Sequence, residues 1–158
     1  MMNLNKNIKI MQVKIVNKSN NPLPEYAHVG DAGMDLRADL TESVTIEPFK
    51  RKLIPTGLYI QMPQDDGCCY EAQVRPRSGL ALKYGISVCN TPGTIDQKYS
   101  DQIGVILINL GEEPFTVNPG DRIAQLVFKK VEKAELIEVD SFKTENDRGG
   151  GYGHSGVK

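Results

Sequence analysis

The stretch CCYEAQVRPRSGLALKYG, residues 68–85, decides the fold class of this chain. From position 68 to position 75 apolar and polar residues alternate, which is typical of a half-buried β-strand. From Ser78 the pattern changes. Ser78 is of a type that caps helix N-termini, helix formers follow, and Gly85 stands where helices often end. We therefore expect a strand followed by one short helix of about two turns.

The period of two continues on both sides of this stretch. Alternating or short apolar runs occur around Val13–Ile15, Val44–Ile46, Leu58–Met62, Ile103–Leu110 and Phe115–Val117. Turn signals separate them, such as Pro63, Pro92-Gly93 and Pro119-Gly120. Many short strands at a spacing of roughly 8–12 residues are typical of an all-β sandwich or barrel. We expect residues 11–144 to form one all-β domain.

The composition limits the function classes. The chain has 158 residues and a formal net charge of −1, which gives no global reason to expect a nucleic acid or a membrane surface as partner. A local basic cluster could still serve a small anion. The odd set of cysteines (Cys68, Cys69 and Cys89) and only two histidines disfavour a zinc site and favour a reduced, cytoplasmic setting. Residues 1–10 lack the apolar stretch of a secretory signal, and we expect a flexible N-terminal extension there.

Two stretches carry candidate chemistry, and each has a plain structural alternative. Arg77 and Ser78 precede the expected helix, whose start could hold a phosphate or could simply be capped. Asn90 and Thr94 flank Pro92-Gly93, which predicts a tight β-hairpin whose backbone could read the edge of a pyrimidine. Asp96 follows this turn, where an aspartate can also serve turn formation alone.

Three further stretches are weaker signals. In DAGMDLRA, residues 31–38, two carboxylates could serve a hard cation, although this is also a common loop composition. In PGDRIAQLVF, residues 119–128, Gln125 is the polar group of an apolar stretch and needs a partner. The tail RGGGYGHSG, residues 148–156, is either a flexible coil or a set of groups that grip a phosphate and stack on a base.

Together these stretches resemble the trimeric dUTPase family. DAGMDLRA, RPRSGLALK, NTPGTIDQKY with GVILINLG, GDRIAQLV and RGGGYGHSG have the order and spacing of that family's motifs, over about residues 11 to 156. The resemblance implies a jelly-roll-like distorted β-barrel and a homotrimer whose active sites are shared between subunits. It also implies Mg²⁺-assisted hydrolysis of dUTP to dUMP and pyrophosphate.

The resemblance also assigns roles to residues. Asp96 would be the general base on a water, and Asp35 would contact Mg²⁺ indirectly through water, the ion lying mainly on the substrate phosphates. Residues 145–158 would form a mobile lid. The substrate-binding residues would be Arg77, Ser78, Gly79, Asn90, Thr94, Ile95, Tyr99, Gln125, Arg148, Tyr152, Gly153, His154 and Ser155.

The chain departs from the family pattern at Ser100-Asp101, where an Arg-Gly or Gln-Gly pair is common, and at Tyr152, where phenylalanine is usual. We expect local consequences only. The alternative functions are a dCTP deaminase-like enzyme of the same fold, a non-enzymatic jelly-roll binding module and a general nucleotide pyrophosphatase.

Overall fold

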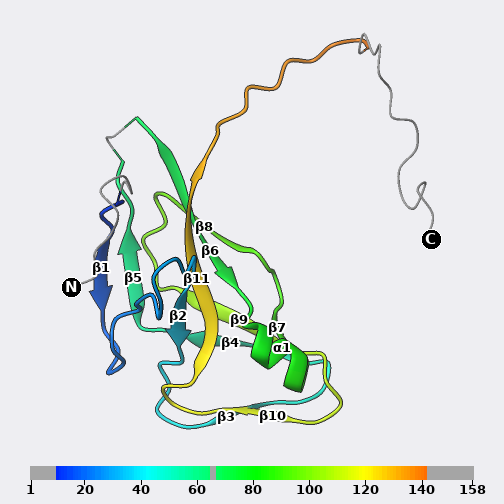
Figure 1. Cartoon of the computed structure of the whole chain (residues 1–158). Helices are drawn as coiled ribbons and strands as arrows, with labels where there is room; N and C mark the ends of the chain where they lie inside the picture. Colours follow the sequence, from blue (N-terminus) through cyan, green and yellow to red (C-terminus); the bar gives the residue numbers. More distant parts are fainter. Residues whose placement is uncertain (1–9, 65–66, 142–158) are drawn as a thin grey trace.

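The computed structural model describes residues 10–64 and 67–141, which form short strands and one helix. The strands are β1 (Lys14–Asn17), β2 (Met34–Arg37), β3 (Val44–Ile46), β4 (Arg51–Pro55), β5 (Leu58–Gln61), β6 (Cys69–Arg75), β7 (Ile86–Val88), β8 (Gly93–Asp96), β9 (Gly104–Asn109), β10 (Phe115–Val117) and β11 (Arg122–Val131). The helix is α1 (Ser78–Tyr84), between β6 and β7 (Figure 1).

The strands form small antiparallel sheets around one core. The sheet orders are β2-β11-β6-β8, β4-β9-β7, β1-β5 and β3-β10. Their inward side chains form one apolar cluster, which includes Leu36, Ile54, Ile86, Leu107 and Leu126, each at most 1% exposed. Burial of these side chains is the main favourable term for the fold. The expected all-β architecture with one short helix is confirmed.

Helix α1 begins one residue earlier than the capping pattern predicted. Arg77 occupies the N-cap position in an extended conformation (φ −92°, ψ 126°), and no side chain there caps the helix. Ser78 is the first helical residue, so the prediction that its hydroxyl caps the helix is wrong. Gly85 ends the helix as expected: it adopts φ 68°, and its N–H donates to the Ala81 carbonyl at 3.0 Å.

The expected hairpin around Pro92-Gly93 is not a pair of strands. The chain does reverse after β7, since Thr91 N–H donates to the Val88 carbonyl at 3.1 Å. However, β7 pairs with β9, whereas β8 pairs with β6 in another sheet. The segment is a turn that crosses between two sheets. Turn residues determine where a chain reverses, but they do not determine which strands then pair.

DAGMDLRA contributes a strand and not only a loop. Asp35 lies on β2, in register with Gln125 of β11. A Cβ atom at Gly33 would lie 2.7 Å from Oε1 of Gln125, so the glycine lets the segment before β2 lie directly on β11. Close packing against β11 therefore explains why a glycine stands between Asp31 and Asp35.

Residues 132–141 form an arm that leaves the body of the molecule after β11 (Figure 1). The arm carries apolar side chains in the open: Leu136 is 93% exposed and Ile137 is 79% exposed. Large apolar side chains in a row outside any core indicate a surface that another chain covers. Within the described ranges, no helix has the length and apolar character needed to cross a membrane.

Candidate active site

One cavity brings together most of the residues predicted to bind the base and sugar. Asn90, Thr94, Ile95 and Tyr99 all line a cavity of about 260 Å³. Val74, Leu53 and Ile106 line the same cavity and make part of it apolar. Ligand pockets usually enclose about 300–1,000 Å³, so this cavity suits a ligand the size of a base and its sugar. We call it the nucleoside cavity.

The start of β8 is shaped by a glycine. A Cβ atom at Gly93 would lie 3.2 Å from Nδ2 of Asn90 and 3.4 Å from Cβ of Val74. The glycine therefore lets the Asn90 amide lie close to the backbone of β8. The Asn90 amide makes no hydrogen bond to any described residue, which leaves its donors and acceptor for a ligand.

Tyr99 follows β8 through a turn. Its N–H donates to the Asp96 carbonyl at 3.0 Å, and its hydroxyl donates to the Gln102 carbonyl at 3.1 Å. These bonds keep the ring at the nucleoside cavity. They also span the Ser100-Asp101 departure, so this segment forms an ordered turn despite lacking the usual glycine.

Asp96 ends β8 with its side chain exposed and outside the lining of the nucleoside cavity. It lies in register with Glu71 of β6, on the face opposite to that of the buried Ile95. Its carboxylate accepts no hydrogen bond from any described residue. A free carboxylate next to a nucleoside cavity can accept a proton from a water.

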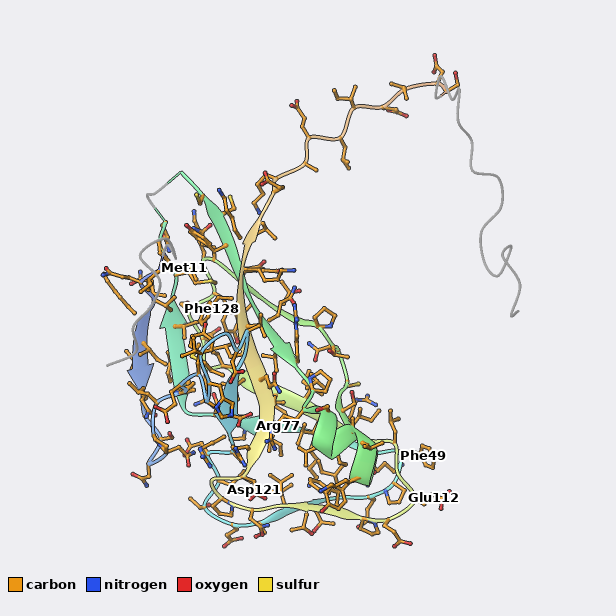
Figure 2. All side chains as sticks on the ribbon, viewed as in Figure 1. Met11, Phe49, Arg77, Glu112, Asp121 and Phe128 are labelled. Atoms are coloured by element: carbon orange, nitrogen blue, oxygen red, sulfur yellow. The ribbon has the colours of Figure 1, made fainter. Side chains whose placement is uncertain are left out.

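Asp35 and two arginines form a charged cluster beside the start of α1. Arg77 donates from Nε to Oδ1 of Asp35 at 3.0 Å, and Arg122 donates from Nη1 to Oδ2 at 3.2 Å. Arg77 also donates to the Arg122 carbonyl at 3.1 Å. Figure 2 shows Arg77 between α1 and β11. The carboxylate thus aligns two guanidinium groups, which suit the oxygens of phosphates.

The other predicted phosphate-binding residues lie close to this cluster in the chain. Gln125 is in register with Asp35 on one side and with Arg75 on the other. Gly79 has open space where a Cβ atom would stand. Neither the Gln125 amide nor the Ser78 hydroxyl bonds to another described residue. Both groups are therefore available to a ligand.

Arg77 and Arg122 lie away from the nucleoside cavity. Arg77 and Arg122 line a cavity of about 320 Å³ that contains none of the predicted base-binding residues. Arg148, Tyr152, Gly153, His154 and Ser155 lie outside the described residues, as do residues 1–9. Arg122 was not among the predicted site residues, and Gly93 was predicted only as a turn residue. The arginine of GDRIAQLV was a signal for Arg122, but its pairing with Asp35 spans 87 positions of sequence.

The donor set does not form a metal cage within the described ranges. No group of three or more His, Cys, Asp and Glu side chains could hold an ion there. This fits Mg²⁺, which keeps several waters and often binds through substrate phosphates together with one or two carboxylates. Asp35 fits an indirect contact, because each of its oxygens accepts one hydrogen bond from an arginine and can accept another from a water.

The comparisons with known proteins agree on one family. The model of the dUTPase family matches residues 19–156. A deoxyuridine 5'-triphosphate nucleotidohydrolase of Cytophaga hutchinsonii is 50% identical over 97% of each chain. One from Finegoldia magna is 47% identical over 92% of this chain and 99% of the relative.

A solved dUTPase variant of Staphylococcus bacteriophage 80alpha, with dUpNHpp, has a TM-score of 0.78 at 26% identity and covers 95% of this chain and 100% of its own. The same fold is thus present across nearly the whole chain. From the family match, the sequence identities and this shared fold, it follows that the chain belongs to the dUTPase family.

Proposed function

We propose that this protein hydrolyses dUTP to dUMP and pyrophosphate, by Mg²⁺-assisted attack of a water on the α-phosphate. The observation that carries the proposal is the nucleoside cavity, where Asn90, Thr94, Ile95 and Tyr99 meet around one space. Asp96 lies next in the chain after Ile95, with an unpaired carboxylate. The family match supports the same reaction.

The nucleoside cavity would select uracil and deoxyribose. Asn90 and the backbone around Ile95 would pair with the uracil edge, and cytosine presents the reversed donor and acceptor pattern. Sites that rely on such hydrogen bonds can reject an analogue by up to about 10⁴–10⁵-fold. The close packing of Asn90 and Val74 around Gly93 would leave no space for a thymine methyl group. Tyr99 would lie under the sugar and exclude a 2′-hydroxyl.

Asp96 would act as the general base. Its carboxylate takes a proton from a water while the water oxygen attacks the α-phosphorus, and the bond to the bridging oxygen of the pyrophosphate breaks. General base catalysis typically contributes about 10²–10⁴-fold. The exposed position of Asp96 at the end of β8 supports this role, because a water can reach it.

The charged cluster would hold the triphosphate. Arg77, Ser78 and Gly79 would contact phosphate oxygens, with Asp35 keeping Arg77 in position. Mg²⁺ on the phosphates would neutralise charge on the leaving pyrophosphate. Asp35 and Gln125 would contact the waters of that ion. Arg148 would clamp the γ-phosphate, Tyr152 would stack on uracil, and Gly153, His154 and Ser155 would add phosphate contacts from the lid at residues 145–158.

We propose a homotrimer with shared active sites. Arg77 lines a different cavity of the chain from the base-binding residues, which supports an arrangement in which a second copy completes each site. The exposed Leu136 and Ile137 of the arm support contact with a neighbouring copy. In a cytoplasmic setting the reaction would keep dUTP low and supply dUMP for thymidylate synthesis.

Heavy-oxygen water tests the reaction. Purified protein with dUTP and Mg²⁺ should release pyrophosphate, and the label should appear in dUMP. Label in pyrophosphate alone would contradict attack at the α-phosphorus. Ammonia release from dCTP would instead support the deaminase-like alternative, which the family match does not favour. Equal rates on dUTP, dTTP and dCTP would indicate a general pyrophosphatase, and no turnover would indicate a binding module.

A further inference from the structure

The ring of Tyr99 lies between two cavities. One is the nucleoside cavity, and the other, of about 390 Å³, is lined by Tyr99 together with Tyr59, Gln97 and Lys98 among others. Tyr99 is 41% exposed, so core packing does not fix its ring. The second cavity has room for a phenol ring, because its volume is many times the roughly 30 Å³ that one water takes up in the liquid. We call it the rear cavity.

The ring is held at one polar atom. The backbone of Tyr99 is fixed through its N–H, which donates to the Asp96 carbonyl at 3.0 Å. The hydroxyl donates to the Gln102 carbonyl at 3.1 Å, and this is the side chain's one hydrogen bond to the described residues. That bond is the one side-chain hydrogen bond to the described residues that a rotation into the rear cavity would break.

The carbonyl that accepts this bond belongs to a rigid part of the chain. Ile103, the next residue, is 1% exposed. Its N–H donates to the Leu58 carbonyl at 2.8 Å, and its carbonyl accepts from the Thr56 hydroxyl at 2.6 Å. The Gln102 amide also reaches the Tyr59 hydroxyl at 3.4 Å. A partly exposed ring is therefore tied to a half-buried residue whose neighbour is buried and hydrogen-bonded.

We propose that the hydrogen bond from the Tyr99 hydroxyl to the Gln102 carbonyl is a latch that sets the discrimination between deoxyribose and ribose. The inference rests on the proposed function, in which Tyr99 lies under the sugar. A ring held in the nucleoside cavity excludes a 2′-hydroxyl, whereas a ring that can move into the rear cavity admits one. Gln102 is then a positioning residue that acts through its main chain, with Tyr59 as its support.

The test compares kcat/KM for dUTP and for UTP. Tyr99→Phe keeps the ring and removes the latch. The ratio of the two constants should fall about five-fold, which is what the loss of one hydrogen bond of ordinary strength gives. The fall should come mainly from a rise in kcat/KM for UTP. Tyr59→Phe removes the support of Gln102 and should lower the ratio by about two-fold.

Tyr84→Phe is the matched control, because it removes a tyrosine hydroxyl on α1 and keeps the ring beside Phe115. This variant should keep the wild-type ratio. An unchanged ratio in Tyr99→Phe, or an equal loss of kcat/KM for both nucleotides, would overturn the latch. If the wild-type protein still hydrolyses dUTP, the proposed function stands. A wild-type protein that does not hydrolyse dUTP would overturn both.

Discussion

Arg77 donates from Nε to Oδ1 of Asp35 at 3.0 Å, and this joins two motifs that lie 42 positions apart in the sequence. Arg122 occupies the other oxygen of the same carboxylate. Asp35 is 28% exposed at its side chain, and Arg77 is 24% exposed. One carboxylate therefore orients two cations, one of which, Arg77, is proposed to contact the phosphates.

Asp35→Asn should weaken substrate binding. The amide keeps the size of the carboxylate but loses the charge that aligns Arg77 and Arg122, so KM for dUTP should rise about ten-fold. Steady-state kinetics measure this change, and circular dichroism checks folding. Asp31→Asn is the matched control in the same motif, since among the described residues the Asp31 carboxylate accepts one hydrogen bond, from the His28 N–H at 2.8 Å. An unchanged KM in Asp35→Asn would refute the orienting role.

Asp96→Asn should bind dUTP and hydrolyse it slowly. The amide cannot take a proton from water, so kcat should fall about 10²–10⁴-fold. Single-turnover kinetics and the dissociation constant of a non-hydrolysable dUTP analogue separate chemistry from binding. Asp101→Asn, in the exposed turn after Tyr99, is the control and should keep kcat. Near-normal turnover by Asp96→Asn would show that another group is the base.

Gly93→Ala should act through Asn90. The new methyl group would stand 3.2 Å from Nδ2 of Asn90, so the amide must move, and the dissociation constant for dUMP should rise about three- to ten-fold. The double variant with Asn90→Ala should show little further loss. Calorimetry measures all four proteins of this cycle. Additive losses would mean that the glycine matters for another reason.

Deletion of residues 148–158 should leave a folded assembly with poor catalysis. The shortened chain loses Arg148, and the loss of one charged phosphate contact typically costs about 1.5–3 kcal/mol, or roughly 10- to 100-fold in rate. Size-exclusion chromatography and kinetics on dUTP measure the two properties. A truncated protein with full activity would contradict the lid.

Leu136→Asp should weaken the assembly. The side chain is 93% exposed in one chain, so the substitution is harmless to an isolated copy but places a charge in any interface that covers the arm. Analytical ultracentrifugation should show a shift toward smaller species. Glu138→Gln, on the same arm, is the control. An unchanged trimer would place the arm outside the interface.

Much of the fold could be predicted from local patterns. The strand β6 and the left-handed Gly85 at the end of α1 are encoded within a few residues, and both are as expected, although the polar Gln73 of β6 is buried together with its apolar neighbours. Other features depend on distant partners. Turn residues at Pro92-Gly93 did not reveal that β7 and β8 join different sheets. The start of α1 shifted by one residue because Ser78 entered the helix.

The candidate site, like the fold, could be predicted only in part from the sequence. Asn90, Thr94, Ile95 and Tyr99 lie close in the sequence, and they share one cavity. Asp35 was expected only near a metal, yet in the structure it holds two arginines. That pairing joins strands far apart along the chain, and periodicity carries no information about it. The roles of these side chains in the reaction remain predictions.

The exposed arm has a consequence for the newly made protein. A lone copy would carry Leu136 and Ile137 into water. In the proposed homotrimer, it would also hold only part of each shared site. Specific activity should therefore fall on dilution, as mass action separates the copies. In the cell, newly made single chains would not hydrolyse dUTP until their concentration was high enough for them to assemble.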